Sequence, residues 1–427
     1  MKFQDRFPLV SKSFEVLLII TAFFLANTNS FVRFRQFPEV DNYSDHEGDF
    51  LAAWMLVLVG AFFVLRTHDL LSSFLAAWKR NRFLIIFLAF AVVSVVWSIY
   101  VPATIYKFLL LMFSALAASY IGVRYTRYGI LDLLSWIGGV FAVLSILVVV
   151  YFPFVGIMQN QTFFGSWTGI FWHRNHTGNL FAFFNSIFLF RLLFDDRARS
   201  SGKVILFAFY ILTAAMVFGS RSATGVIVFL FLHFVVALTA FWLKFNTSIK
   251  AWHYYAFAIV LIAGFLVFVT NLGFFFGLLG RSASMTGRVP LWQDLFSRVY
   301  LERPILGYGY GALWSLKSFR LEMQFQNNWS HQIYFADNGF FDILLNLGLV
   351  GFLLFLAVYI SLGVRGFKQA VVTKSWIDFL PLLTFLYILI GNLTYSFLLE
   401  VDQFVWMLLV LMVFVTTTNR SNKIAQP

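Results

Sequence analysis

Long apolar runs, separated by short polar segments, occupy almost the whole chain. Each run is long enough to cross a hydrocarbon core of roughly 30 Å as a helix. They begin near residues 13, 50, 83, 104, 129, 176, 204, 222, 253, 341, 377 and 401. This pattern predicts an all-α integral membrane protein with about 12 spans. No Pro/Gly/Ser-rich linker and no repeat of fixed period divides the chain, so residues 1–427 are expected to form one polytopic membrane domain.

One long segment of mixed polarity interrupts the apolar pattern. It covers 277–341, between the ninth and tenth predicted spans. Within it, Pro290 suits the first turn of a short helix, and Leu291, Leu295 and Val299 recur at helical spacing on one face. We expect this helix to lie on the outer surface of the membrane. The segment is therefore predicted to be a large extracytoplasmic loop that carries short surface helices.

Composition and charge agree with the bilayer as the surrounding medium. Hydrophobic residues make up 60% of the chain and charged residues only 12%, too few for a water-exposed surface. The net charge of +12 is better explained by basic cytoplasmic loops than by nucleic-acid binding. Most Lys and Arg fall inside if the N-terminus is cytoplasmic, so both termini are predicted inside and the long loop outside. The apolar run within the first 30 residues is expected to stay as the first helix, because no small-x-small cleavage site follows it.

Several cations are left outside against this topological bias. We favour Arg174, Arg221, Arg288 and Arg303 as ligands of an anionic substrate, with Lys107 as a further positive charge. The planar guanidinium donates two parallel hydrogen bonds to phosphate and keeps its charge. Several converging arginines would therefore hold a pyrophosphate. The alternative for each is a side chain that snorkels to lipid headgroups.

Candidates for proton transfer lie at the end of the loop. Asp337 is the preferred base, because it lies just before the tenth span and close in sequence to the loop arginines. Its alternative role is the N-cap of the following helix. His331 is the competing base, since imidazole titrates near neutral pH, and its alternative is an exposed loop histidine. Arg298 follows Asp294 by four residues, which favours a simple surface ion pair on one helix.

Glycines, aromatic residues and histidines add less specific signals. Three glycines alternate after Pro304 without a strand–loop–helix context, so they indicate close backbone approaches rather than a nucleotide site. Trp292 and Tyr308 could stack on sugar rings or belong to an interfacial aromatic belt. His173 and His176 lie three apart with no evident third ligand, so no metal site is predicted. The chain has no cysteine, hence no thiolate nucleophile and no disulfide.

Taken in order, the polar motifs resemble those of the O-antigen ligase and polymerase superfamily, including exopolysaccharide polymerases. The matching segments are SVVWSIYVPATIYK (94–107), WTGIFWHRNHTGNL (167–180), GSRSATG (219–225), TGRVPLWQDLF (286–296), ERPILGYGYGALW (302–314), DNGFFDILLNLGLVG (337–351) and GNLTYSFLLEVDQFVW (391–406). Each is weak alone. Their order, together with the large loop before the tenth span, makes the resemblance specific.

The resemblance implies a GT-C-like glycosyltransferase that uses no nucleotide sugar and no cofactor. Its donor would be a glycan on undecaprenyl pyrophosphate, and an acceptor hydroxyl would attack the anomeric carbon. By analogy the outer arginines stabilise the leaving pyrophosphate, and Asn338 joins Trp292 and Tyr308 in positioning the acceptor sugar. One departure is clear, because many members have histidine where this chain has Asp337. A carboxylate can still accept a proton or orient the acceptor hydroxyl.

Three functions follow as hypotheses. The first is a polymerase that joins lipid-linked repeat units of O-antigen or exopolysaccharide in the bacterial inner membrane. The second is a ligase that moves finished glycan onto lipid A core or another acceptor, since the shared motifs do not separate the two. The third is a transporter, for which ionisable residues and broken helices are expected at the bilayer midplane. The charges gather instead at the ends of the spans, which favours the enzymes.

Overall fold

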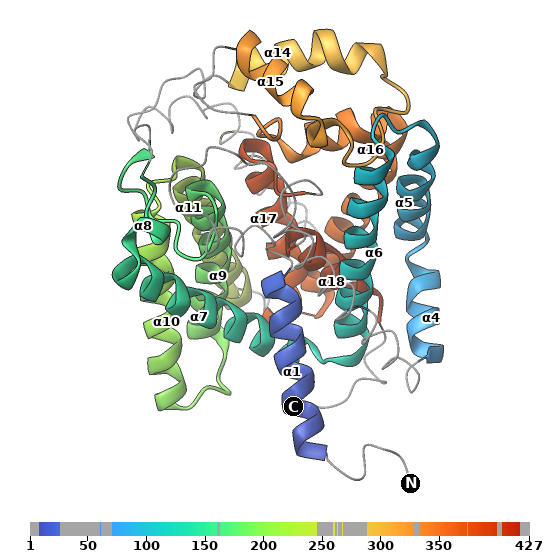
Figure 1. The fold of residues 1–427 in the computed structure, drawn as a ribbon. Helices are drawn as coiled ribbons and strands as arrows, with labels where there is room; N and C mark the ends of the chain where they lie inside the picture. The colour runs from blue at the N-terminus through green and yellow to red at the C-terminus, as the bar shows by residue number, and fades with distance from the viewer. Residues whose placement is uncertain are drawn as a thin grey trace.

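The computed structural model is a bundle of long helices whose loop segments cover one end (Figure 1). It describes residues 8–25, 60, 71–159, 163–245, 259–260, 263, 267, 288–327, 333–373, 375–398 and 404–418. The residues so described contain helices and turns, and an isolated bridge between Ile157 and Trp167. The predicted all-α class is confirmed.

Within the described residues, seven helices are long and apolar enough to cross a membrane, or eight if the bent pair α4 and α5 makes one span. The N-terminal half contains α1 (Pro8–Leu25), α4 (Leu71–Arg80), α5 (Arg82–Val93), α6 (Val101–Arg124), α7 (Arg127–Tyr151), α9 (Arg174–Phe194), α10 (Ser200–Gly219) and α11 (Ala223–Phe245). The C-terminal half contains α16 (Gly339–Thr373), α17 (Leu380–Thr394) and α18 (Phe404–Thr417). The short pieces are η3 (Ser94–Trp97), α8 (Pro153–Gly156), α14 (Arg288–Asp294), η7 (Leu295–Val299), η8 (Tyr300–Glu302), η9 (Leu313–Ser315), α15 (Lys317–Gln326) and η10 (Trp376–Phe379).

The 12 predicted spans are supported in part. The spans predicted near 104, 129, 176, 204, 222, 341 and 377 coincide with the seven candidate helices. Those near 13 and 401 fall on the shorter α1 and α18, and that near 83 falls on α5 of the pair bent by 83°. The spans near 50 and 253 lie almost wholly outside the described residues. The number 12 therefore remains a prediction.

Helix α18 forms the centre of the bundle. Its side chains from Phe404 to Val415 are all at most 1% exposed. The indole of Trp406 donates to the carbonyl of Leu111 in α6, at 3.0 Å. A helix that is apolar all round has no polar face to turn to water, so it is enclosed by its neighbours.

The long helix α16 is broken near its start. Gly348 has φ 62° and ψ −169°, a backbone region essentially restricted to glycine. An added Cβ at Gly348 would lie 2.3 Å from the Ile305 carbonyl oxygen. The loop backbone therefore passes directly over the break, and 339–347 form a separate short helix above the span.

The glycine-rich part of the loop also lies against α6 and its entrance. Gly309 has φ 99°, and an added Cβ would lie 2.6 Å from the Ser98 side chain. The backbone of Ile99 donates to the Tyr308 carbonyl at 3.0 Å. Gly311, with φ 67°, leaves room for the Lys107 side chain, 2.2 Å from an added Cβ. The expectation of close backbone approaches is confirmed.

The helix predicted in the loop exists, and its apolar face packs against other loop residues. Leu291, Leu295 and Val299 share one face, as predicted, and all three are buried. They pack into a second core with Tyr308, Trp314, Ala336 and other loop residues. The loop thus supplies its own apolar core, and the expected position of the helix on the outer membrane surface stays a prediction. Arg298 forms the expected surface pair with Asp294, 2.7 Å from Nε to Oδ1.

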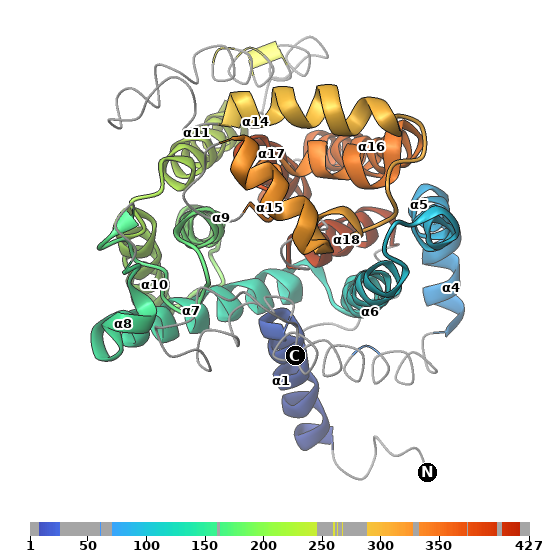
Figure 2. The ribbon, with the colours of Figure 1, turned by 45° about the horizontal axis from the view of Figure 1, so that its top comes forward.

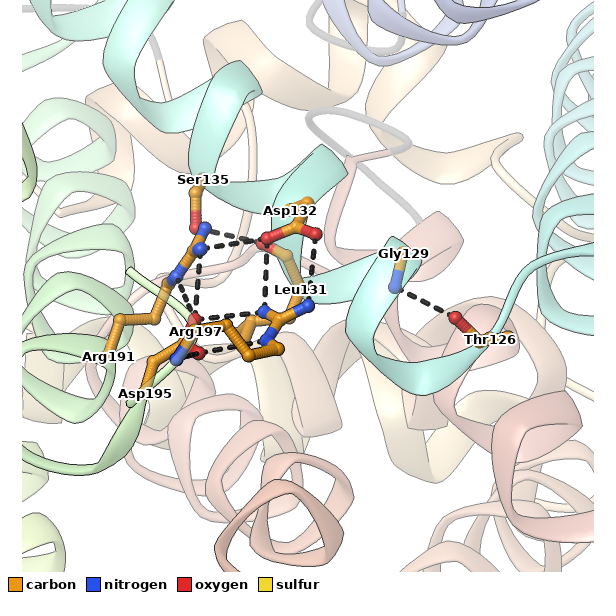
Figure 3. Close-up of polar contacts among 8 residues, drawn as sticks. All are labelled: Thr126, Gly129, Leu131, Asp132, Ser135, Arg191, Asp195 and Arg197. Carbon is orange, nitrogen blue, oxygen red and sulfur yellow. Dashed lines mark hydrogen bonds and ion pairs between the residues drawn. The ribbon is translucent and has the colours of Figure 1, made fainter. Parts of the chain in front are cut away.

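The end of the bundle opposite the loop is held by paired charges (Figure 3). Arg191 Nη2 lies 2.8 Å from Asp132 Oδ1 and 3.0 Å from Asp195 Oδ2. Arg197 Nε lies 2.8 Å from Asp195 Oδ1. Burial alone would raise the pKa of Asp195, but the hydrogen bonds and charges of Arg197 and Arg191 outweigh it and lower the pKa. These arginines, which the sequence places inside, thus have acidic partners.

Candidate active site

Two arginines meet where α9 and α11 begin. Arg174 is the first residue of α9 and is buried, and its Nη1 donates to the carbonyl of Arg221 at 2.6 Å. Arg221 occupies the turn between α10 and α11 with a positive φ of 51°. Its exposed side chain donates from Nη1 to the Phe164 carbonyl at 3.2 Å. Neutral carbonyl acceptors orient Arg221 without cancelling its charge.

Small residues make this convergence possible. An added Cβ at Gly225 would lie 2.6 Å from the Cα of Gly178, so α9 and α11 touch backbone to backbone. Beside this contact Ser222 Oγ donates to Asn175 Oδ1 at 2.9 Å. The short side chains of the GSRSATG segment therefore allow the two helix starts, and their arginines, to come together.

An ion pair joins α14 to the segment just before α16. The buried Arg288 opens α14, and its Nε donates to Asp337 Oδ2 at 2.9 Å. Asp337 has a positive φ of 54°. Trp292, one helical turn after Arg288, donates from its indole to the Ala336 carbonyl at 2.6 Å. The first turn of α14 is thus bound to Asp337, the candidate base, and to its neighbour Ala336.

The adjacent Asn338 starts the short helix of α16. Its Oδ1 accepts from the backbone N–H groups of Phe340 and Phe341, each at 3.1 Å. This is the geometry of an N-cap. The capping role weighed for Asp337 therefore falls to Asn338, and the Asp337 carboxylate pairs with Arg288 instead.

Aromatic contacts link the residues next to Arg174 with those next to Asp337. The ring of His173, next to Arg174, stacks parallel to Tyr395 at 6.0 Å between centroids. Phe335, two residues before Asp337, packs edge-on against Tyr395 at 5.1 Å and against Trp172 at 5.8 Å. Ring contacts through His173, Tyr395 and Phe335 therefore link the segment that carries Arg174 to the segment that carries Asp337.

A buried carboxylate fixes the geometry around Asp337. Asp342 is fully buried, and it accepts from the Trp314 indole at 2.7 Å and from the Ala336 N–H at 3.0 Å. Ser396 Oγ makes a very short contact with its other oxygen. These donors come from the loop, from the segment before α16 and from the segment after α17. Asp342 thus ties together the three segments that surround Asp337.

Arg303 and Tyr308 lie elsewhere. Arg303 is exposed, and its guanidinium lies 5.2 Å from the centre of the Tyr308 ring. The buried Tyr308 donates to the Val299 carbonyl at 2.8 Å, and its hydroxyl lies 3.1 Å from Glu302 Oε2. Burial, and then the hydrogen bond with Glu302, raises the pKa of Tyr308 to about 12. Tyr308 is therefore a packing residue of the loop core.

The segment from α14 to η8 separates Arg303 from Arg288. It crosses the loop end of the bundle (Figure 2), and Pro304, at its far end, accepts from Leu349 N at 2.8 Å. Fifteen helical residues at about 1.5 Å each span about 20 Å, far more than the width of a pyrophosphate. The structure places Arg174 against Arg221 and Arg288 against Asp337, and Arg303 lies at the far end of the α14–η8 segment. Lys107 lies beneath Gly311.

The remaining predicted residues make no contact with the Arg288–Asp337 pair that the structure describes. His331 lies outside the described residues, as do residues 277–287 of the loop. His173 caps α9 by accepting from Asn175 N at 3.2 Å, and His176 packs on Phe171. Across the described ranges, no three His, Asp or Glu side chains cluster as a metal site would require.

One part of the chain matches a known family. Residues 208–356, from within α10 to within α16, match the family model described as O-antigen ligase. This match supports the resemblance to the O-antigen ligase and polymerase superfamily. No curated protein sequence matches the chain. The matched region contains Arg221, Arg288 and Asp337, and with the apolar helices it indicates a multi-pass inner-membrane protein.

Sequence reasoning gave too little weight to Asp342 and none to its partner Ser396. The available signal was a lone acid inside the apolar FFDILL run, since such a residue must find partners in a membrane protein. Nothing local in the sequence indicated that the partners would be Trp314, Ala336 and Ser396, because they come from three different segments.

The Asp342 contacts lead to a stability prediction. The Trp314 indole and the Ala336 N–H can only donate, so Asp342→Ala would leave both without an acceptor. We expect a loss of about 1–3 kcal/mol per unsatisfied group, measured as a lower unfolding temperature in detergent. The matched control is Asp294→Ala, which breaks a surface pair worth at most about 1 kcal/mol. Equal unfolding temperatures for the two variants would contradict the role given to Asp342.

Proposed function

We propose that the protein is a glycosyltransferase that polymerises repeat units of O-antigen or exopolysaccharide. The donor is a glycan on undecaprenyl pyrophosphate, and the acceptor is a sugar hydroxyl. Glycosyl transfer of ligase or polymerase type is what the match to the O-antigen ligase family model supports. The observation that carries the finer proposal is that the Arg174–Arg221 contact and the Arg288–Asp337 pair both lie at the loop end of the bundle.

In this proposal Arg174, Arg221 and Arg288 stabilise the pyrophosphate. The bond between the anomeric carbon and the phosphate oxygen breaks as the acceptor oxygen forms its new bond to that carbon. Charge then develops on the leaving pyrophosphate, and preorganised guanidinium groups lower the barrier there. The arginines supply this positive charge themselves, so the mechanism assigns no role to a metal ion or cofactor.

Asp337 accepts the proton of the attacking hydroxyl. In the resting site its carboxylate is paired with Arg288. When the donor pyrophosphate binds Arg288 it competes for the same guanidinium, which weakens the pair and releases the carboxylate to accept the proton. Donor binding and base activation are thereby coupled. His331 remains the alternative base, and Asn338 and Trp292 lie beside Asp337 where the acceptor sugar would be positioned.

The whole chain is proposed to be one GT-C-like membrane domain with 12 spans and both termini in the cytoplasm. The loop 277–341 then lies on the extracytoplasmic side and forms part of the site. Supporting this orientation, the end opposite the loop carries arginines of the short segments predicted inside, among them Arg191, Arg197 and Arg365.

Purified protein incubated with a synthetic polyprenyl-pyrophosphate oligosaccharide as the only substrate tests the activity. Mass spectrometry should resolve a ladder of lengthening lipid-linked glycans, also in the presence of a chelator. The family description favours a ligase as the second candidate. Products that appear only after lipid A core or another acceptor is added would replace the polymerase with a ligase. No donor consumption in either case would leave the transporter as the better hypothesis.

The arginine clamp predicts large losses in the same assay. Arg221→Ala and Arg288→Ala should each lower turnover by about 100- to 1000-fold, because each removes a donor to the developing charge. Arg298→Ala is the matched control, since Arg298 lies on the same loop helix and pairs at the surface with Asp294. Near-normal turnover in both test variants would remove the clamp from the mechanism.

Replacement of Asp337 by Asn separates proton transfer from structure. The amide still accepts a hydrogen bond from Arg288, and the cap of α16 belongs to Asn338, so the fold is preserved. Turnover should fall by about 100-fold or more, as expected for loss of a general base. Donor affinity should be retained. Unimpaired turnover of Asp337→Asn would transfer the role of base to another group, with His331 the first to examine.

A further inference from the structure

Three large apolar side chains are exposed at the far end of the α14–η8 segment. Leu301, Ile305 and Leu306 are 55%, 62% and 42% exposed. They lie beyond the loop core, which already encloses Leu291 and Leu295. Grouped apolar side chains of this size are not stable against water without a partner.

The rim formed by 301–306 is continuous with two helices that face lipid. Val350 N donates to the Ile305 carbonyl at 3.2 Å, and the Trp97 indole donates to the Leu306 carbonyl at 3.0 Å. Beside these contacts Leu353 of the α16 span is 55% exposed, and Val96 of η3 is 84% exposed. The apolar surface therefore passes from the two helices onto the loop without interruption.

The backbone carbonyls of the rim accept hydrogen bonds from other groups of the protein. The carbonyls of Pro304, Ile305 and Leu306 accept from Leu349 N, Val350 N and the Trp97 indole, respectively. In addition, Arg303 N donates to the Tyr300 carbonyl at 3.1 Å, and the Arg303 carbonyl accepts from Gly307 N at 3.1 Å. Pro304 has no N–H. Irregular backbone is tolerated at membrane depth where its polar groups are satisfied within the protein, and the carbonyls of 303–306 meet this condition.

We propose that residues 301–306 insert into the outer leaflet of the bilayer and anchor the loop there. Leu301, Ile305 and Leu306 enter the boundary between headgroups and acyl chains. The exposed guanidinium of Arg303, supported by the Tyr308 ring, lies at headgroup level and binds a lipid phosphate. The partner is thus the phospholipid surface itself, and Arg303 serves the membrane rather than the donor pyrophosphate.

This anchor deepens the proposed function and rests on it in one respect. Arg288 begins the same helical segment whose far end the rim holds at the membrane. A fixed contact with the bilayer at 301–306 sets the depth of Arg288 relative to the lipid phosphates. A polyprenyl-linked pyrophosphate lies at that depth, so the anchor aligns the clamp with its substrate.

Site-specific labelling of the full-length protein tests the insertion. The chain has no cysteine, so single cysteines at Leu301 and Ile305 can each carry one environment-sensitive fluorophore. Matched controls carry the label at Gln293 and Ser318, two exposed loop positions outside the rim. Liposomes of phosphatidylethanolamine and phosphatidylglycerol are prepared with and without lipids that bear a nitroxide on the acyl chain. Iodide serves as the quencher in water.

Labels at Leu301 and Ile305 should show blue-shifted emission, strong quenching by the lipid nitroxide and little quenching by iodide. The control labels should show the reverse. Equal iodide quenching at Ile305 and Ser318 would overturn the proposal. Protection of Ile305 from both quenchers would also overturn it, because a second copy or another protein would then cover the rim. The readout needs no donor, so a failed anchor and a failed enzyme assay are separate results.

Discussion

The buried carboxylate of Asp342 sets the constraint on which the rest of the site depends. A charged group in an apolar interior is tolerated only when donors surround it. Here the donors come from the loop, from the segment before α16 and from the segment after α17. Satisfying one carboxylate therefore forces three segments, distant in sequence, into a single arrangement. Asp337 lies five residues before it and is placed by that arrangement.

Glycines provide the complementary constraint on the backbone. The loop crosses the broken start of α16 so closely that Gly348 has no room for a side chain. The break separates a short helix, capped by Asn338, from the spanning part of α16. The short helix can therefore hold Asp337 against Arg288 while it points in a different direction from the spanning part of α16. The same crossing supplies the hydrogen bonds that allow 304–306 to face lipid.

The partners of Arg221 at the loop end differ from those of the paired arginines at the opposite end. At the end opposite the loop, Arg191, Arg197 and Arg127 are paired with aspartates, so their charges are locally balanced. At the loop end Arg221 is oriented by a neutral carbonyl, and within the described residues it has no carboxylate partner. Balanced pairs stabilise a fold, whereas an oriented and unbalanced cation can bind an anion. This contrast supports an anion-binding role for Arg221, whereas Arg288 would exchange Asp337 for the donor pyrophosphate.

The sequence by itself determined the helical class, the positions of seven candidate spans, the long loop and the resemblance to the O-antigen ligase and polymerase superfamily. Hydropathy and ordered motifs are local properties, and the bilayer leaves the chain few alternatives to helices. Only the tertiary structure decided which arginines converge, that Asn338 rather than Asp337 caps α16, and that Arg303 lies about 20 Å from Arg288, at about 1.5 Å per helical residue. The apolar face of α14 likewise found its partner in the loop core. These outcomes depend on contacts between residues far apart in sequence, and no local pattern encodes the packing that brings such residues together.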